Sequence, residues 1–331
     1  MGIRLAGRST VWLSTVLVLI AFAPLSSHSE QWPSKPVRII APYPAGGPGD
    51  VPARAFGQVL SEMLGQPFLI ENRLGADGII GAEACAKAPA DGHTLCFVSN
   101  GVTVVNPAIR LKLPYDSRDL VPVVHTGTLH TVVLVHRSVP ANSMQEVIAT
   151  LKAKPQSLTY GTYGQVTLSF FLAEWLKARM GASFYQVPYK SATQALQALV
   201  AGEVQAASYA LGAARALVQA GKLKALAINS DQRLASLPDV PTLKELGIEV
   251  PYRSWFGIYA PRGTANEIVR RLNTEIARML ADAQFKAKSI TPLGFETDWP
   301  TGASPEEFAS YVRAESDKWG AIIRATGAKA D

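Results

Sequence analysis

The sequence predicts an α/β protein with two Rossmann-like lobes around a cleft. The chain has 331 residues, which is enough for about two domains of the usual ~100–200 residues. Hydrophobic residues make up 48% of it and charged residues 18%, so both domains can bury a sizeable core. Strand-like and helical segments alternate, joined by short loops rich in Gly and Pro, and this pattern is typical of parallel βαβ units.

The first 29 residues form a predicted signal peptide. Arg4 and Arg8 precede an apolar run over residues 11–23, and small residues follow, as in secretory signals. We expect cleavage after Ser27 or Ser29. The run is shorter than the ~20 apolar residues of a spanning helix, so an uncleaved anchor helix is the less favoured alternative. The mature protein is expected to be soluble.

Two blocks of alternating segments follow. In the first, the predicted strands are Lys35–Tyr43, Pro67–Asn72 and Thr94–Ser99, and the helices are Val51–Leu64 and Ile79–Lys87. In the second, the strands are Val132–Val135, Leu158–Gly161, Tyr185–Pro188, Val204–Ser208 and Ala225–Asn229, and the helices are Met144–Lys154, Ser169–Met180, Thr193–Ala201 and Ala213–Ala220.

The C-terminal stretch has one strand-like segment, Phe256–Ala260, and two helices, Asn266–Leu280 and Pro305–Thr326. One strand cannot form a sheet alone, so this stretch is expected to return to the first block. The predicted organisation is a first lobe from residues 30–127, a second lobe from residues 128–252, and a return over residues 253–331. A chain that crosses twice between lobes leaves a cleft that a hinge can close.

Charge and cysteine content exclude several classes of protein. Without Arg4 and Arg8 the formal charge falls from +6 to +4, and no Lys/Arg block remains, so no nucleic-acid partner is expected. Cys85 and Cys96 could form a disulfide, but two unpaired, buried small side chains are the favoured interpretation. The five His form no HExxH motif, and we expect no metal site and no cofactor.

The loop Pro42–Asp50 (P-Y-P-A-G-G-P-G-D) is the first candidate binding element. Its glycines leave backbone N–H groups free at a helix N-terminus, which favours an anion. Asp50 could cap that helix at the same time. A dinucleotide fingerprint, with Glu71 as the ribose-binding acid, is disfavoured because Pro52 stands where its third Gly belongs.

Polar residues also follow a strand in each block. Ser99-Asn100-Gly101 ends the third strand, and Thr162–Thr167 follows a strand of the second block. Ligands of open α/β sheets bind at such carboxyl ends. The sequence offers no G-x-S-x-G elbow and no Cys/His pair at catalytic spacing, so we predict no catalytic residue and a binding protein rather than an enzyme.

At this point the chain resembles the receptors of tripartite tricarboxylate transporters, the Bug or TctC family, from about Trp32 to its C-terminus. The segments that carry the resemblance are Arg38–Ile40, Pro42–Asp50, Gly65–Pro67, Glu71–Arg73, Asp91–Leu95, Asn106–Ala108, Leu113–Asp116, Val187–Lys190, Ala220–Ala227, Leu237–Thr242, Trp255–Gly257, Ala260–Pro261 and Gly263–Thr264.

The resemblance implies a periplasmic binding protein of the type II-like fold. Such a receptor is a monomer that closes over a small carboxylate and delivers it to membrane permease subunits. One carboxylate would be held by the first lobe and the distal one by the second. The residues that inherit these roles are Tyr43, Ala45, Gly46, Gly47, Asp50, Ser99 and Asn100 in the first lobe, and Thr162, Tyr163 and Thr167 in the second.

Departures from the family pattern restrict the kinds of ligand that we expect. Gln205 and Ala210 stand where the family often has acids, and an ammonium group would need such an acid. Tyr163, Phe170 and Tyr209 add aromatic surface. We therefore expect a ligand with carboxylate ends, no amine, and an apolar or aromatic body. The alternative for Phe170 and Tyr209 is packing in the core.

Two other functions stay open from the sequence. The same receptor could dock on a sensor-kinase ectodomain instead of a permease, because both use the closed form. An exported enzyme on this scaffold is the third interpretation, although the sequence offers no nucleophile–base set for it.

Overall fold

The structure is a computed structural model that describes residues 1–2 and 32–326. The predicted signal peptide and its cleavage sites at Ser27 and Ser29 therefore lie outside the described residues. No helix within the described ranges is long and apolar enough to cross a membrane.

The first lobe is built on a six-stranded sheet with the order β11-β4-β10-β3-β1-β2. Strand β1 pairs in parallel with β2 and β3, whereas β10 lies antiparallel between β3 and β4. Four of the five residues of β1 and five of the six of β3 are buried, as expected of strands covered on both faces. The strands are β1 (Val37–Ala41), β2 (Phe68–Asn72), β3 (Thr94–Ser99), β4 (Leu120–Leu129), β10 (Ser254–Pro261) and β11 (Phe295–Glu296).

The second lobe has a five-stranded sheet with the order β7-β6-β8-β5-β9. Strand β6 pairs in parallel with β7 and β8, and β5 lies antiparallel between β8 and β9. In both sheets an antiparallel strand, β10 or β5, thus lies beside three parallel ones, and in the first sheet β11 adds a second antiparallel strand at the edge. The strands are β5 (Thr131–His136), β6 (Thr159–Thr162), β7 (Tyr185–Pro188), β8 (Ala206–Ala210) and β9 (Leu223–Asn229).

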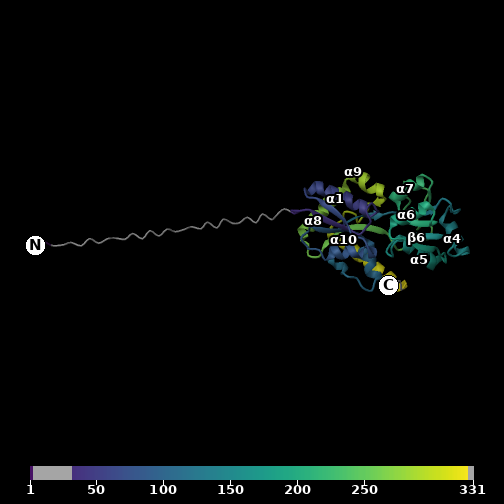
Figure 1. The fold of residues 1–331 in the computed structure, drawn as a ribbon, viewed down its shortest axis with the longest axis horizontal. Helices are drawn as coiled ribbons and strands as arrows, with labels where there is room; N and C mark the ends of the chain where they lie inside the picture. Colours follow the sequence, from purple (N-terminus) through teal and green to yellow (C-terminus); the bar gives the residue numbers. More distant parts are fainter. Residues whose placement is uncertain (3–31, 327–331) are drawn as a thin grey trace. The chain divides into compact units, whose positions relative to one another are not determined.

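Helices cover both sheets (Figure 1). Helix α8 shows why: Leu272, Ile276 and Met279 are buried at helical spacing, so this face packs on the sheet and its polar face meets water. The first lobe carries α1 (Asp50–Leu64), α2 (Ile79–Ala86), α3 (Asn106–Ile109), α8 (Asn266–Ala281), α9 (Ala283–Phe285) and α10 (Pro305–Thr326). The second carries α4 (Met144–Ala153), α5 (Leu168–Met180), α6 (Ala192–Ala201) and α7 (Leu211–Gln219).

The chain passes between the sheets twice. It leaves the first sheet after Leu129 and starts the second at Thr131, with His130 between them. It returns through residues 230–253, between the end of β9 and Ser254. The predicted fold class, two α/β lobes, is confirmed.

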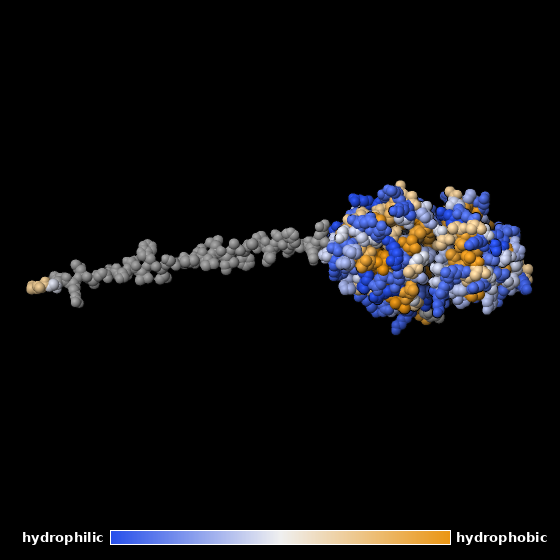
Figure 2. All heavy atoms as spheres, turned by 45° about the horizontal axis from the view of Figure 1, so that its top comes forward, coloured by the Kyte–Doolittle hydropathy of each residue, from blue (hydrophilic) through white to orange (hydrophobic). Residues whose placement is uncertain are grey.

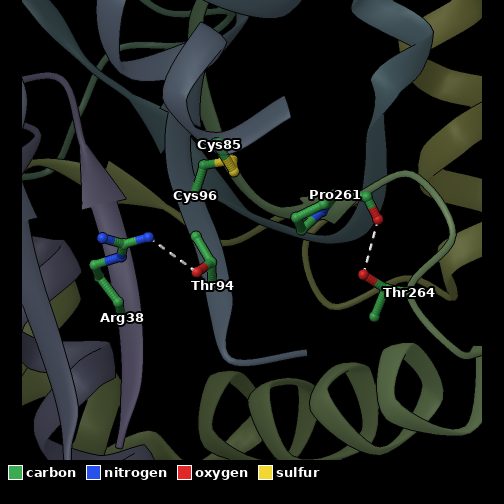
Figure 3. Close-up of a disulfide and its surroundings, with 6 residues drawn as sticks. All are labelled: Arg38, Cys85, Thr94, Cys96, Pro261 and Thr264. Carbon is green, nitrogen blue, oxygen red and sulfur yellow. Dashed lines mark hydrogen bonds between the residues drawn. A yellow bond between two sulfur atoms is a disulfide. The ribbon is translucent and has the colours of Figure 1, made fainter. Parts of the chain in front are cut away.

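The preference for unpaired cysteines was wrong. Cys85 on α2 and Cys96 on β3 form a disulfide (Figure 3). Helix α2 packs over the strand and brings the two Cα atoms to 6.1 Å, which is within the range that a disulfide spans. In the same view Arg38 of β1 donates to Thr94 of β3 at 3.3 Å, across the parallel pair.

Candidate functional site

A cavity of about 520 Å³ lies between the two sheets. This volume is in the range of small-molecule sites. Figure 2 shows hydrophobic residues on both sides of the furrow between the lobes. The first lobe lines the cavity with the Tyr43 loop, the turn Leu74–Gly78, Ser99 and Val102. The second lobe adds residues 163–164 and 166–168, Tyr189–Ala192 and Ala210, and the crossings add Leu129, Thr131, Tyr252, Ser254 and Phe256.

Tyr43 anchors the first-lobe side of the cavity. Its phenol oxygen accepts a 2.6 Å hydrogen bond from the Ser99 backbone N–H, and its ring packs against Phe256 with 5.5 Å between centroids. Burial raises the pKa of Tyr43 well above its usual range, so the hydroxyl keeps its proton. Tyr43 can therefore accept from Ser99 and still donate to a bound ligand.

Asp50 holds the conformation of the Pro42–Asp50 loop through hydrogen bonds. Its carboxylate accepts hydrogen bonds from Gly46 N–H at 2.8 Å, Arg54 Nε at 2.8 Å and Asn72 Nδ2 at 2.7 Å. Burial would raise the pKa of this carboxyl, but the bonds from Arg54, Asn72 and Gly46 outweigh it and hold the pKa below its usual value. Asp50 is 1% exposed, so its contribution to the cavity is to fix the loop shape.

Ala45, Gly46, Gly47 and Asp50 are not among the cavity-lining residues, whereas Pro48 and Gly49 of the same loop are. The ligand contact predicted for these four residues stays a prediction. Sequence reasoning missed Asn72, although its place at the end of β2 was the available signal.

Ser99 lines the cavity, and its neighbour Asn100 is fully buried. The Asn100 amide donates to the carbonyl of Arg253 at 2.8 Å and accepts from Trp255 N–H at 3.3 Å. These bonds use both ends of the side chain and attach the β3 loop to the second crossing. Asn100 thus positions the crossing segment beside the cavity.

In the second lobe, Tyr163 and Thr167 line the cavity. Thr167 caps α5, because its hydroxyl accepts from Phe170 N–H at 3.4 Å, and it donates to the Tyr163 carbonyl at 3.2 Å. Burial raises the pKa of Tyr163 well above its usual range, and the nearby Tyr160, Tyr209 and Tyr252 add to the effect. The Tyr163 hydroxyl is therefore a neutral donor.

Three other predicted residues do not line the cavity. Thr162 and Tyr209 are buried, at 7% and 3% exposure, and Phe170 packs edge-on against Phe171 at 5.5 Å. For Phe170 and Tyr209 this arrangement agrees with the alternative of packing within the fold. Tyr189, Tyr252 and Phe256 instead give the cavity aromatic surface that sequence reasoning missed.

Lys190 is the strongest site residue that sequence reasoning missed. Among the described residues that line the cavity it is the only one with a cationic side chain. Ser191 follows it and caps α6 by accepting from Gln194 N–H at 3.3 Å. Helices α5 and α6 thus both begin at the cavity wall, where helix N-termini favour anions. The available signal was the segment Val187–Lys190.

The chemistry of the cavity is that of an anion receptor. Its described lining residues include one lysine, the first residues of two helices, tyrosines whose phenols are neutral and other apolar side chains, and their one acid is Asp77. Asp77 is paired with Arg110, 2.8 Å away. The two-sheet topology and this inter-lobe cavity are those of a two-lobed solute-binding protein with the periplasmic binding protein fold.

Comparisons with known proteins identify the family. The family model described as "Tripartite tricarboxylate transporter family receptor" matches residues 53–328. Protein BugT of Bordetella pertussis is 33% identical over 322 residues, covering 96% of this chain and 98% of BugT. The chain therefore belongs to the TctC family of tripartite tricarboxylate transporter receptors. This is a family of binding proteins, not of enzymes.

Solved structures of binding proteins are also similar to this chain. The R. palustris protein Rpa4515, solved with adipate, is 33% identical with a TM-score of 0.82, covering 89% of this chain and 98% of that one. MatC from Rhodopseudomonas palustris, solved with bound malate, is 30% identical with a TM-score of 0.79, covering 88% of this chain and 100% of that one.

Proposed function

We propose that this receptor captures a small dicarboxylate in the periplasm by closing its two lobes, and delivers it to the membrane permease subunits of a tripartite transporter. The observation that carries the proposal is that Lys190 and the first residues of α5 and α6 line the cavity from the second lobe, whereas Tyr43 lines it from the first. Donors on facing walls suit a ligand with a carboxylate at each end.

The body of the ligand is apolar in this proposal. Tyr43, Tyr163, Tyr189, Tyr252 and Phe256 surround the space between the donors, and such surfaces favour a methylene chain or an aromatic ring over a polar one. The adipate in Rpa4515 and the malate in MatC support a dicarboxylate as the ligand class.

A thermal-shift and calorimetry panel tests the ligand class. Succinate, glutarate, adipate, malate and terephthalate are compared with aspartate and glutamate on the mature protein. We expect adipate or terephthalate to raise the unfolding temperature most, and a preference for either amino acid would overturn the amine-free ligand. Uptake of the labelled ligand by cells that carry the permease, lost when the receptor is deleted, tests delivery.

Lys190→Met tests the site itself. Removing the one cationic side chain among the described lining residues is expected to weaken dicarboxylate binding roughly tenfold, which corresponds to ~1.4 kcal/mol. Lys154→Met is the matched control, because Lys154 is exposed on the second lobe and does not line the cavity. Equal affinities for both variants and the native protein would place the carboxylate elsewhere.

A further inference from the structure

Asp77 has an unusual backbone for a side-chain-bearing residue. It lies in the turn Ala76–Gly78 between β2 and α2. Its φ is 52° and that of Ala76 is 47°, so two consecutive non-glycine residues occupy the left-handed region. That conformation costs free energy in residues with a Cβ, and it persists where surrounding contacts hold it.

Contacts within the first lobe hold this turn. The Arg110 guanidinium donates to Asp77 Oδ2 at 2.8 Å, and both side chains are largely buried, at 15% and 17% exposure. Asn106 donates its amide to the Asp77 carbonyl at 3.1 Å and accepts from Arg110 Nε at 3.1 Å. The carboxylate is thereby fixed in direction and its charge is balanced.

The same carboxylate reaches the second lobe. Its Oδ2 accepts from the backbone N–H of Gln165 at 3.3 Å. A Cβ built on Gly164 would lie 2.4 Å from Oδ1, so a residue without a side chain is needed for this approach. Gly164 also has a φ of +70°, which suits glycine. Asp77 thus links the lobes directly at the cavity wall.

We infer that Asp77 is a positioning residue that holds the closed form together, as a latch between the Arg110 side of the first lobe and the Gly164–Gln165 turn of the second. A contact made only when the lobes meet shifts the equilibrium toward the closed form. The apparent affinity for a ligand scales with the fraction of binding-competent molecules. The effect on affinity rests on the proposed function, whereas the effect on lobe closure does not.

The experiment compares Asp77→Gly and Asp77→Asn with the native protein. Asp77→Gly removes the carboxylate and suits the left-handed backbone, so the fold is retained. Asp77→Asn keeps an oxygen for Gln165 N–H but loses the charge that Arg110 pairs. Asp116→Asn is the control, because Asp116 also pairs with an arginine of the first lobe, Arg118, but on the surface.

The distance between the lobes is measured by double electron–electron resonance between spin labels at Glu62→Cys on α1 and Lys177→Cys on α5. The two native cysteines are joined in the disulfide, so only the introduced ones react. Without ligand, we expect longer and broader distances in Asp77→Gly, a smaller change in Asp77→Asn, and none in Asp116→Asn. Unchanged distances in both Asp77 variants would overturn the latch.

Adipate titration supplies the second readout. We expect roughly three- to tenfold weaker binding in Asp77→Gly, with the short distance restored at saturation. Tighter binding in either Asp77 variant would show that Asp77 repels anions instead, and would overturn the inference. If adipate binds to none of the proteins, the proposed ligand class fails, while the distances without ligand still decide whether Asp77 joins the lobes.

Discussion

The side-chain amide of Asn72 donates a 2.7 Å hydrogen bond to Oδ1 of Asp50 and a 2.9 Å bond to the carbonyl of Tyr43. One residue at the end of β2 therefore fixes both the start of α1 and the strand exit that presents the Tyr43 phenol. The buried carboxylate shapes the cavity by holding this loop, while Tyr43 provides the surface that a ligand meets.

Replacing Asp50 by Asn should lower stability at pH 7 by about 2–3 kcal/mol, because hydrogen bonds from charged and neutral donors to a buried carboxylate are lost. The pKa of Asp50 is depressed in the folded state, so its contribution is present above the unfolded value and is lost as the pH falls through the folded value. The difference in unfolding free energy between the native protein and Asp50→Asn, measured with urea, should therefore be smaller at pH 3 than at pH 7. Asp317→Asn, at an exposed position, should show no such difference at either pH.

Gly49→Ala should weaken adipate binding about tenfold, an estimate based on one displaced donor. A Cβ at Gly49 would lie 2.3–2.7 Å from atoms of the Tyr43 ring, so the ring must move and the bond from Ser99 N–H breaks. Calorimetric titration measures the change. An unaltered affinity would mean that Tyr43 does not touch the ligand.

Gly65→Ala is the matched control for that experiment. Gly65 ends α1 with a φ of +72°, and a Cβ there would meet nothing within 4 Å. The left-handed backbone should cost about 1 kcal/mol of stability, with adipate affinity unchanged.

Removing the Cys85–Cys96 disulfide should destabilise the protein by about 3 kcal/mol, from the chain entropy of closing a short loop; the sequence separation is 11. The measurement is the urea midpoint of the double Cys→Ala variant. Both cysteines are 0% exposed in the folded protein, so dithiothreitol should reduce the disulfide only in unfolded molecules. With dithiothreitol present throughout the urea titration, the midpoint of the native protein should therefore fall. A reductant effect on the double variant would contradict this assignment, since no other cysteine exists.

The crossings carry a titratable cluster that should make stability depend on pH. His130 Nε2 lies 3.2 Å from Glu296 Oε2, and Arg253 contacts both Glu296 at 3.9 Å and Asp231 at 2.8 Å. Burial, with a smaller effect from Asp298, raises the pKa of Glu296 to about 7. Burial, assisted by Arg253, lowers the pKa of His130 to about 4.

The signs of these two shifts oppose each other. As the pH rises from about 4.5 through 7, the folded Glu296 holds a proton that the unfolded chain has lost, so its contribution to stability falls. The neutral His130 contributes above pH ~6.5 and loses that contribution as the pH falls. Glu296→Gln keeps the uncharged shape at every pH. It should melt at a higher temperature than the native protein at pH 8, with the difference vanishing near pH 5; a constant difference across this range would refute the shifted carboxyl.

The sequence predicts elements well where local pattern and tertiary environment agree. The helix expected over Val51–Leu64 is observed as Asp50–Leu64, and that over Asn266–Leu280 as Asn266–Ala281. The stretch around His125 is strand-like in sequence, but Pro122, His125 and Gly127 interrupt its apolar pattern, so the bounds of β4 were not predicted; its pairing with β10 defines it as a strand. Propensity alone does not reveal such pairing.

Some residues of the candidate site could likewise be predicted from the sequence, and others could not. Tyr43, Ser99, Tyr163 and Thr167 were predicted because they follow strands, where the topology of an α/β sheet gathers polar groups. Lys190, Asp77 and Tyr252 were missed, because a helix cap, a β–α turn and a crossing segment become neighbours only when the lobes meet. The tertiary fold sets which residues of the two lobes lie close together, so local sequence patterns do not predict these contacts.

The place of β10 in the first sheet also constrains the order in which the protein can assemble. All strands of the second sheet lie within residues 131–229, a continuous stretch, whereas the first sheet needs Ser254–Pro261 between β3 and β4. During synthesis, the N-terminal half of the first sheet emerges early but must wait for its central strand, while the second sheet is already complete. The lobe that starts the chain is therefore the last to finish folding, and until then β3 and β4 keep open edges that other chains could pair with.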